Sequence, residues 1–130
     1  MHSESPDLQT ELKIEFVAPS RQSPAVLVVG GRATFRQAPA LRRSLFEAIS
    51  TTSQGPLMVD LSEVRRMDTA SMAVLVEGII STRDLAPEVL LCGPTERVRR
   101  VFRLAGLDEA LGKCPSCQEE VLRMMEGGLA

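Results

Sequence analysis

Residues 57–76 read LMVDLSEVRRMDTASMAVLV, and this stretch decides the fold of the chain. Its apolar start, 57–61, predicts a buried strand, the polar residues that follow predict a turn, and the second apolar segment has the spacing of a helix. The first turn of that helix carries Asp68, Thr69 and Ser71. Backbone N–H groups at a helix start lack partners and the helix dipole favours negative charge there, so a hydroxyl at this place either caps the helix or accepts a phosphate.

The rest of the chain surrounds this stretch with alternating strands and helices. This order predicts an α/β fold in which the later strands are parallel and joined by right-handed crossovers. Apolar runs predict further strands at 12–17, 25–29 and 89–92, and apolar residues at helical spacing predict helices at 34–49, 69–83, 94–105 and 116–126.

Local signals mark the ends of several of these elements. The glycines at 30–31 are expected to end the second strand, and Thr34 and Gln37 have the spacing of a capping box at the start of the next helix. Gly106 is expected to end the helix that precedes it. Gly78 lies inside a helix, where glycine costs about 1 kcal/mol relative to alanine, so we expect it to allow close packing on the sheet.

Composition limits the classes of function. The chain has 130 residues, 44% of them apolar, which suits one domain with a single core. Its formal net charge of −2 and its four Phe, with no Trp or Tyr, argue against binding nucleic acid. No apolar run is long enough to cross a membrane, and residues 1–10 are too polar for a signal peptide. We therefore expect a cytoplasmic protein that neither binds nucleic acid nor inserts into a membrane.

The sequence offers little for a metal, a cofactor or catalysis. Three cysteines are an odd number that fits no disulfide framework, and Cys92 is expected to be a small core residue. Cys114 and Cys117 form a CxxC pair, for which zinc or redox chemistry is a minor alternative to ordinary cap and loop positions. The only histidine, His2, lies in the polar tail, and no P-loop or GxGxxG motif is present. We expect no enzymatic activity, no metal and no cofactor.

Two of the polar features also have a purely structural interpretation. Asp68 is well placed to be only the N-cap of the helix that follows it. The basic side of the helix at 94–105 suits a solvated face, with a surface for an anionic partner as the alternative. The basic side consists of Arg97, Arg99, Arg100 and Arg103.

In this order the segments resemble the STAS domain, the fold of anti-sigma factor antagonists. The resemblance covers about residues 12–125, and it implies a STAS-like α/β fold with a mixed sheet of four to five strands and about four helices packed mainly on one side. It places the domain at 12–126, between tails at 1–11 and 127–130. The matching segments are VVGG at 28–31, VDLS at 59–62, MDTASMAVL at 67–75, LCGPTERV at 91–98 and VFRLAGL at 101–107.

The resemblance also implies a binding switch. In this family, an anti-sigma factor that is also a serine/threonine kinase phosphorylates a Ser or Thr just after the Asp. The unmodified antagonist binds the kinase and frees a sigma factor, phosphate breaks that complex, and a phosphatase reverses the change. The matching acceptor is Thr69, which is the better positional match, with Ser71 as the second choice. Ala70 replaces the second hydroxyl of the usual motif, and Ser71 stands where Gly is common. The implied partner-binding residues are Thr34, Asp68, Thr69, Ala70, Ser71 and Met72.

Two other functions are compatible with the same residues. Asp68-Thr69-Ala70 also resembles the motif of STAS subunits that support an ABC-type lipid transporter, and the partner would then be the transporter ATPase. Alternatively, phosphorylation has been lost and the domain only scaffolds a larger signalling complex.

Overall fold

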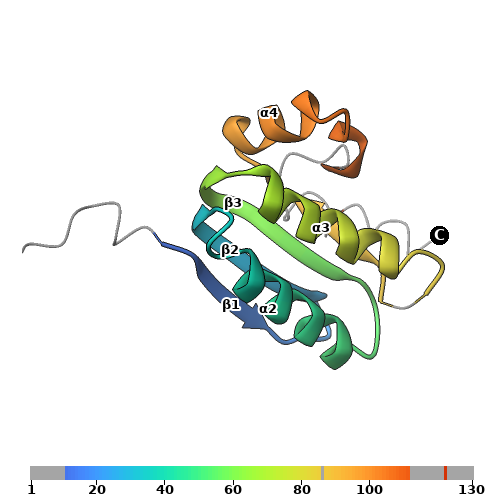
Figure 1. The fold of residues 1–130 in the computed structure, drawn as a ribbon. Helices are drawn as coiled ribbons and strands as arrows, with labels where there is room; N and C mark the ends of the chain where they lie inside the picture. Colours follow the sequence, from blue (N-terminus) through green and yellow to red (C-terminus); the bar gives the residue numbers. More distant parts are fainter. Residues whose placement is uncertain (1–10, 86, 112–121, 123–130) are drawn as a thin grey trace, which may run out of the picture.

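The computed structural model describes residues 11–85, 87–111 and 122, which form one sheet with helices packed against it (Figure 1). The strand order is β1-β2-β3-β4, with β1 antiparallel to β2 and the other two pairs parallel. The predicted α/β class with a mixed sheet is therefore confirmed, whereas the helix predicted at 116–126 lies outside the described residues. In chain order the elements are β1 (Lys13–Val17), β2 (Ala25–Ala33), α2 (Ala38–Thr51), β3 (Leu57–Met67), α3 (Thr69–Ser81), β4 (Val89–Cys92), α4 (Glu96–Leu104) and the 3-10 helix η1 (Asp108–Leu111).

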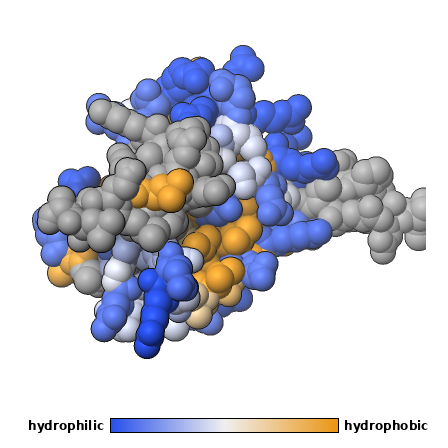
Figure 2. Space-filling model, turned by 180° about the vertical axis from the view of Figure 1, so that it is seen from behind, coloured by the Kyte–Doolittle hydropathy of each residue, from blue (hydrophilic) through white to orange (hydrophobic). Residues whose placement is uncertain are grey.

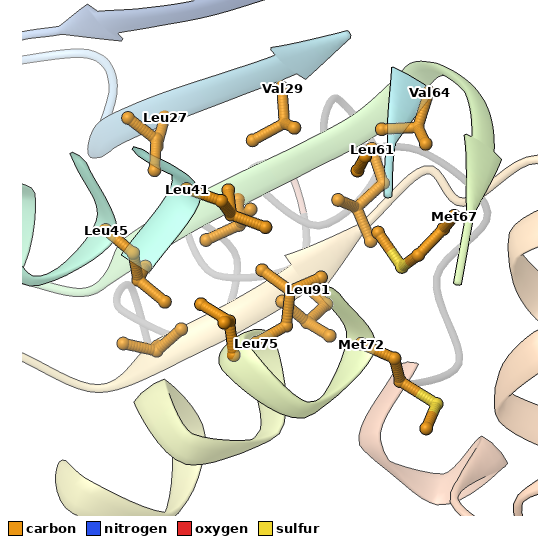
Figure 3. Packing of buried hydrophobic residues seen from close by; sticks show 14 of the residues in the cluster. Leu27, Val29, Leu41, Leu45, Leu61, Val64, Met67, Met72, Leu75 and Leu91 are labelled. Carbon is orange, nitrogen blue, oxygen red and sulfur yellow. The ribbon is translucent and has the colours of Figure 1, made fainter. Parts of the chain in front are cut away.

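The core lies between one face of the sheet and helices α2 and α3, which run side by side across that face (Figure 1). Phe102 and Val98 of α4 are fully buried as well, so this helix belongs to the same core. Each such side chain stabilises the folded state by about 1.5–3 kcal/mol relative to an exposed one. In Figure 3 the strands contribute Leu27, Val29, Leu61 and Leu91, and the helices contribute Leu41, Leu45, Met72 and Leu75.

Strands β2 and β3 are longer than the sequence patterns predict. The expected stop at glycines 30–31 is wrong, because β2 passes through them with two register shifts and continues pairing with β3 as far as Ala33 opposite Met67. Gly31 has a φ of 81°, which favours glycine, and a Cβ on Gly30 would lie 3.1 Å from the Cβ of Glu63. The expected polar turn after 57–61 is wrong for the same reason, since pairing with the extended β2 holds it as strand.

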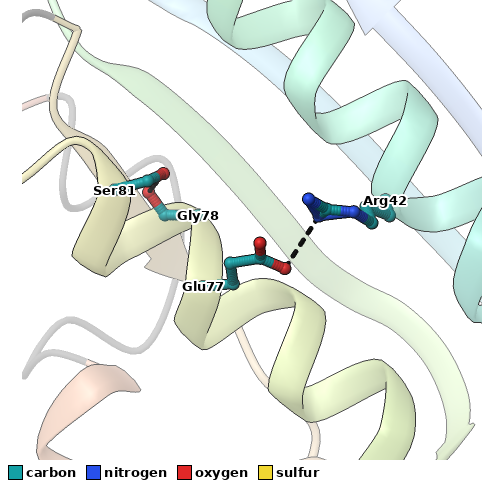
Figure 4. Close-up of polar contacts among 4 residues, drawn as sticks. All are labelled: Arg42, Glu77, Gly78 and Ser81. Atoms are coloured by element: carbon teal, nitrogen blue, oxygen red, sulfur yellow. Dashed lines mark hydrogen bonds and ion pairs between the residues drawn. The ribbon is translucent and has the colours of Figure 1, made fainter.

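Gly78 brings helices α2 and α3 together rather than packing on the sheet as expected. A Cβ at this position would lie 2.7 Å from Cδ2 of Leu45 in α2, which is closer than real Cβ contacts allow. Beside it, the guanidinium of Arg42 pairs with the carboxylate of Glu77 at 2.8 Å, with both side chains about half exposed (Figure 4). An exposed pair of this kind contributes less than about 1 kcal/mol, so the close helix contact depends mainly on the missing side chain.

Helix α4 ends as the sequence predicts. Gly106 has a φ of 73°, and the N–H of Leu107 donates to the carbonyl of Phe102 at 2.8 Å, which gives this terminal carbonyl a partner.

The sheet face opposite α2 and α3 is less completely buried. Because side chains alternate along a strand, Val26 and Val28 of β2 point away from these two helices, and both are only half-buried. Figure 2 shows the rear of the molecule, where one group of apolar side chains lies near the centre with hydrophilic ones to its right, and smaller apolar groups lie to its left. None of the helices in the described part of the chain is long and apolar enough to span a membrane.

Candidate functional site

The candidate site is the junction between β3 and α3. Asp68 is the N-cap of α3, and its Oδ1 accepts a hydrogen bond from the N–H of Ser71 at 3.2 Å. Thr69 is the first residue of the helix, and its side chain is exposed. The cap interpretation of Asp68 is therefore correct, and it is compatible with a hydroxyl that faces solvent one residue later.

A second loop is attached to this junction. Ala33 and Met67 are paired at the ends of β2 and β3, so the two strands end side by side. The loop after β2 therefore lies next to Asp68. The N–H of Phe35 donates to Oδ2 of Asp68 at 2.6 Å, and the N–H of Asp68 donates to the carbonyl of Ala33 at 3.1 Å. One carboxylate thus holds two segments that are 33 residues apart in the chain.

The hydroxyl of Ser71 makes a further bond between the same loops. Ser71 is 0% exposed, and its hydroxyl donates to the carbonyl of Thr34 at 3.2 Å. A buried hydroxyl with a partner stabilises the junction, whereas it offers no surface to an enzyme that would modify it. The helical phase gives the same result from sequence, since Ser71 lies one turn before the fully buried Leu75.

The loop at 34–37 differs from the predicted capping box. Helix α2 begins at Ala38 with Gln37 as its N-cap, and no side chain caps it. The side-chain oxygen of Gln37 accepts from the N–H of Thr34 at 3.3 Å, as it would in a capping box. The Thr34 hydroxyl, however, donates to that same oxygen instead of accepting from the backbone of Gln37. The prediction of a helix from 34 is wrong because these residues form a turn that reaches Asp68.

The implied partner-binding residues divide into a surface group and a buried group. Thr69 is exposed, and Thr34, Asp68 and Ala70 are half-buried at the same end of the sheet. Ser71 and Met72 are buried, with Met72 only 5% exposed and packed in the core.

Phe35 is a surface residue at the site that the sequence patterns missed. Its side chain is 65% exposed, although its N–H is bound to Asp68. The guanidinium of Arg36 lies 5.8 Å from the ring centroid, within range of a weak cation–π contact. Exposed aromatic side chains are typical of interface anchors, so Phe35 is a further candidate residue of the site. The sequence patterns missed the exposure of Phe35 because the capping-box spacing assigned 34–37 to a helix.

The other candidate groups lie elsewhere or serve the fold. The carboxylate of Asp60 accepts from the N–H of Ser62 at 2.9 Å. Within residues 11–85 and 87–111, no group of three His, Cys, Asp or Glu side chains could hold a metal ion. Cys92 is fully buried as expected, but it is disulfide-bonded, so the expectation of no disulfide is wrong for this residue. Cys114 and Cys117 lie outside the described residues.

The basic side of α4 is at the surface, as the sequence predicts. Arg97, Arg100 and Arg103 are exposed and Arg99 is half-buried. Arg103 pairs with Glu96 at 3.4 Å, an exposed contact of little energetic weight.

Comparison with known proteins gives matches over most of the chain. The family model described as the STAS domain matches residues 15–121. An anti-sigma-B factor antagonist from Listeria monocytogenes is 29% identical over 85 residues, which are 65% of this chain and 74% of the relative.

Solved structures share the fold at low sequence identity. An anti-sigma-factor antagonist (STAS) domain protein from Planctomyces limnophilus superposes with a TM-score of 0.72 at 16% identity, covering 86% of this chain and 97% of that one. The anti-sigma factor antagonist SpoIIAA in its unphosphorylated form gives 0.65 at 18% identity, covering 89% and 96%. SpoIIAA of Bacillus in its phosphorylated form gives 0.63 at 16% identity, covering 86% and 99%.

Proposed function

This chain belongs to the STAS domain family, and on that premise we propose that it is a phosphorylation-controlled partner switch. In this proposal, the unmodified protein binds an anti-sigma factor that is also a serine/threonine kinase, through the loop and helix start at 67–72, and a sigma factor is released. Phosphorylation of Thr69 breaks the complex, and a phosphatase restores the binding form. The protein acts in the cytoplasm by binding alone, without enzymatic activity of its own.

The relatives support this proposal in general terms. The Listeria relative is named as an antagonist of an anti-sigma factor. SpoIIAA, whose fold this chain shares, has been solved both with and without phosphate.

The observation that carries the proposal is the different exposure of the two hydroxyls at the helix start. Thr69 is exposed at the first residue of α3, next to the capping carboxylate of Asp68. Ser71 is 0% exposed and donates its hydroxyl to Thr34. A kinase must reach the hydroxyl that it modifies, so this geometry favours Thr69 over Ser71.

The position also explains how a phosphate could change binding without unfolding the domain. A phosphate adds about −1.5 to −2 charge at neutral pH, and the N-terminus of a helix favours negative charge. A partner that covers Thr69 would have to desolvate the phosphate beside the Asp68 carboxylate, and like charges in an interface cost several kcal/mol. A loss of about 2.7 kcal/mol corresponds to a loss of about 100-fold in affinity.

The test is an affinity capture from a lysate of the source cells with the wild-type protein and Thr69→Glu side by side. We expect the wild type to retain an anti-sigma factor of the kinase class, and Thr69→Glu to lose about 100-fold of it, measured by quantitative mass spectrometry. Ser53→Glu is the matched control, because Ser53 is exposed in the loop between α2 and β3. This control should bind like the wild type.

Phosphorylation itself is tested with the captured kinase and ATP, followed by peptide mapping. Thr69→Ala should abolish incorporation, and Ser71→Ala should leave it unchanged in the fraction that remains folded. Equal incorporation into Thr69→Ala and the wild type would refute the assignment of the acceptor. Capture of a transporter ATPase, with no kinase or anti-sigma factor, would refute the proposed function in favour of a transporter subunit.

A further inference from the structure

A basic groove lies where β2 and β3 approach the start of α4. Its volume is about 940 Å³, and its walls come from β1, the ends of β2 and β3 beyond their register shifts, and the first residues of α4. Five basic side chains line it: Lys13, Arg32, Arg65, Arg66 and Arg97. Among the described residues only two acidic side chains line it, whereas the whole chain has 15 basic and 17 acidic residues. The groove is therefore a local concentration of positive charge on an acidic protein.

Three of the basic side chains of the groove have no acidic partner among the described residues. Glu96 pairs with Arg103, which lies outside the groove lining. Arg65, Arg66 and Arg97 are exposed, and within the described part of the chain they have no hydrogen bond or ion pair. Unpaired guanidinium groups that converge on one groove favour an anionic partner.

The groove is built into the fold. Its floor includes Gly30 and Gly31, where side chains are missing and the backbone bulges. Thr95 fixes one wall, because its hydroxyl donates to the carbonyl of Val64 at 3.2 Å and also caps α4 by accepting from the N–H of Val98 at 3.3 Å. A partner would not have to order these elements when it binds, which lowers the entropic cost of binding.

From these observations we propose that the groove docks an acidic, extended segment of a protein partner. The side chains of Arg65, Arg66 and Arg97 end in planar guanidinium forks, which match the geometry of carboxylates. None of the described residues that line the groove is aromatic, so these residues give bases nothing on which to stack. Its basic side chains are exposed or half-exposed, which suits a segment that lies along the surface better than a small ligand that must be enclosed.

This proposal goes beyond the phosphorylation switch and does not depend on it. Thr69 does not line the groove, and of the four arginines on the basic side of α4 only Arg97 does. The groove is therefore expected to bind an acidic segment equally well in the wild type, Thr69→Ala and Thr69→Glu. Failure of the Thr69 assignment would leave this expectation unchanged.

The test measures peptide binding by fluorescence anisotropy, with a labelled peptide of alternating Glu and Ser and with a second peptide in which Gln replaces every Glu. We expect the Glu peptide to bind the full-length wild type and the Gln peptide not to bind. The variant Arg65→Glu/Arg66→Glu/Arg97→Glu should bind at least about tenfold more weakly. Raising the salt concentration from about 50 to 200 mM should weaken binding to the wild type, since exposed charges are screened.

The matched control is Arg21→Glu/Arg43→Glu/Arg83→Glu, which makes the same change in net charge at exposed residues outside the groove. This control should bind the Glu peptide like the wild type, and circular dichroism should show that both variants are folded. The milder Arg65→Gln/Arg66→Gln gives the same comparison if charge reversal unfolds the domain. Equal loss in the control, no binding to the wild type, or displacement of the peptide by ATP at lower concentration than by unlabelled peptide would overturn the proposal.

Discussion

The carboxylate of Asp68 should be one of the largest single polar contributions to the stability of this domain. It accepts from the N–H of Ser71 at 3.2 Å and from the N–H of Phe35 at 2.6 Å. Losing an N-cap costs about 1 kcal/mol, and a hydrogen bond to a charged group contributes about 1.5–3 kcal/mol. Phe35 lies in an exposed loop where water can replace the carboxylate, so the lower end applies. We expect Asp68→Ala to lower the free energy of unfolding by about 2–3 kcal/mol.

Asp68→Asn separates the two bonds. Its amide keeps one oxygen, which can accept from one N–H, while its NH₂ group would face the other N–H as a second donor. We expect this variant to lose about half as much, roughly 1–2 kcal/mol. Both variants should still fold, because a domain of this size has about 5–15 kcal/mol of stability.

Urea denaturation followed by circular dichroism is the assay, because the chain has no Trp or Tyr for fluorescence. Glu47→Ala is the control, since Glu47 is exposed on α2 and such changes stay within about 0.5 kcal/mol. An Asp68→Ala protein that is as stable as Glu47→Ala would refute the conclusion that this carboxylate holds the two loops together.

Three further substitutions test other features of the structure. Gly78→Ala should lower the free energy of unfolding, measured by urea denaturation, by up to about 2 kcal/mol, because the strain of a Cβ placed 2.7 Å from Cδ2 of Leu45 exceeds the gain in helix propensity of about 1 kcal/mol. Ala73→Gly in the same helix measures that propensity difference separately. Thr95→Ala should lower it by about 1–2 kcal/mol in the same assay, and Thr95→Ser, which keeps both bonds of the hydroxyl, by less than about 0.5 kcal/mol. Phe35→Ala should change the free energy of unfolding by less than about 0.5 kcal/mol, but it should weaken binding of the captured kinase at least about tenfold, as measured by titration calorimetry. An unchanged affinity would show that Phe35 is not part of the interface.

Local patterns in the sequence predicted several of the elements and the N-cap at the start of α3. Apolar runs and helical spacing depend only on neighbours a few residues away, so they predicted the strand at 89–92, the helix that starts at Thr69 and the cap of that helix at Asp68. The same kind of reasoning predicted the helix end at Gly106. Resemblance to the STAS domain then indicated which hydroxyl to consider first.

The features that local patterns missed depend on pairing between distant segments. The polar residues 62–66 are strand because their backbone pairs with the part of β2 at and beyond its glycines. The residue types at 62–66 do not by themselves indicate this pairing. The turn at 34–37 was predicted as helix because the bond from Phe35 to Asp68, 33 residues away, cannot be read from either loop alone.

The sequence by itself thus determined a strand, a loop and a helix with Asp68 and Thr69 at its start, because these depend on short-range spacing and on the unpaired N–H groups of a helix terminus. Only the tertiary structure decided which side of that helix start faces solvent and what lies beside it. Packing of α3 on the sheet buries Ser71 and leaves Thr69 exposed, and the register of β2 and β3 brings Phe35 to the same place. The exposed surface around the start of α3 is therefore set by contacts between segments far apart in the chain.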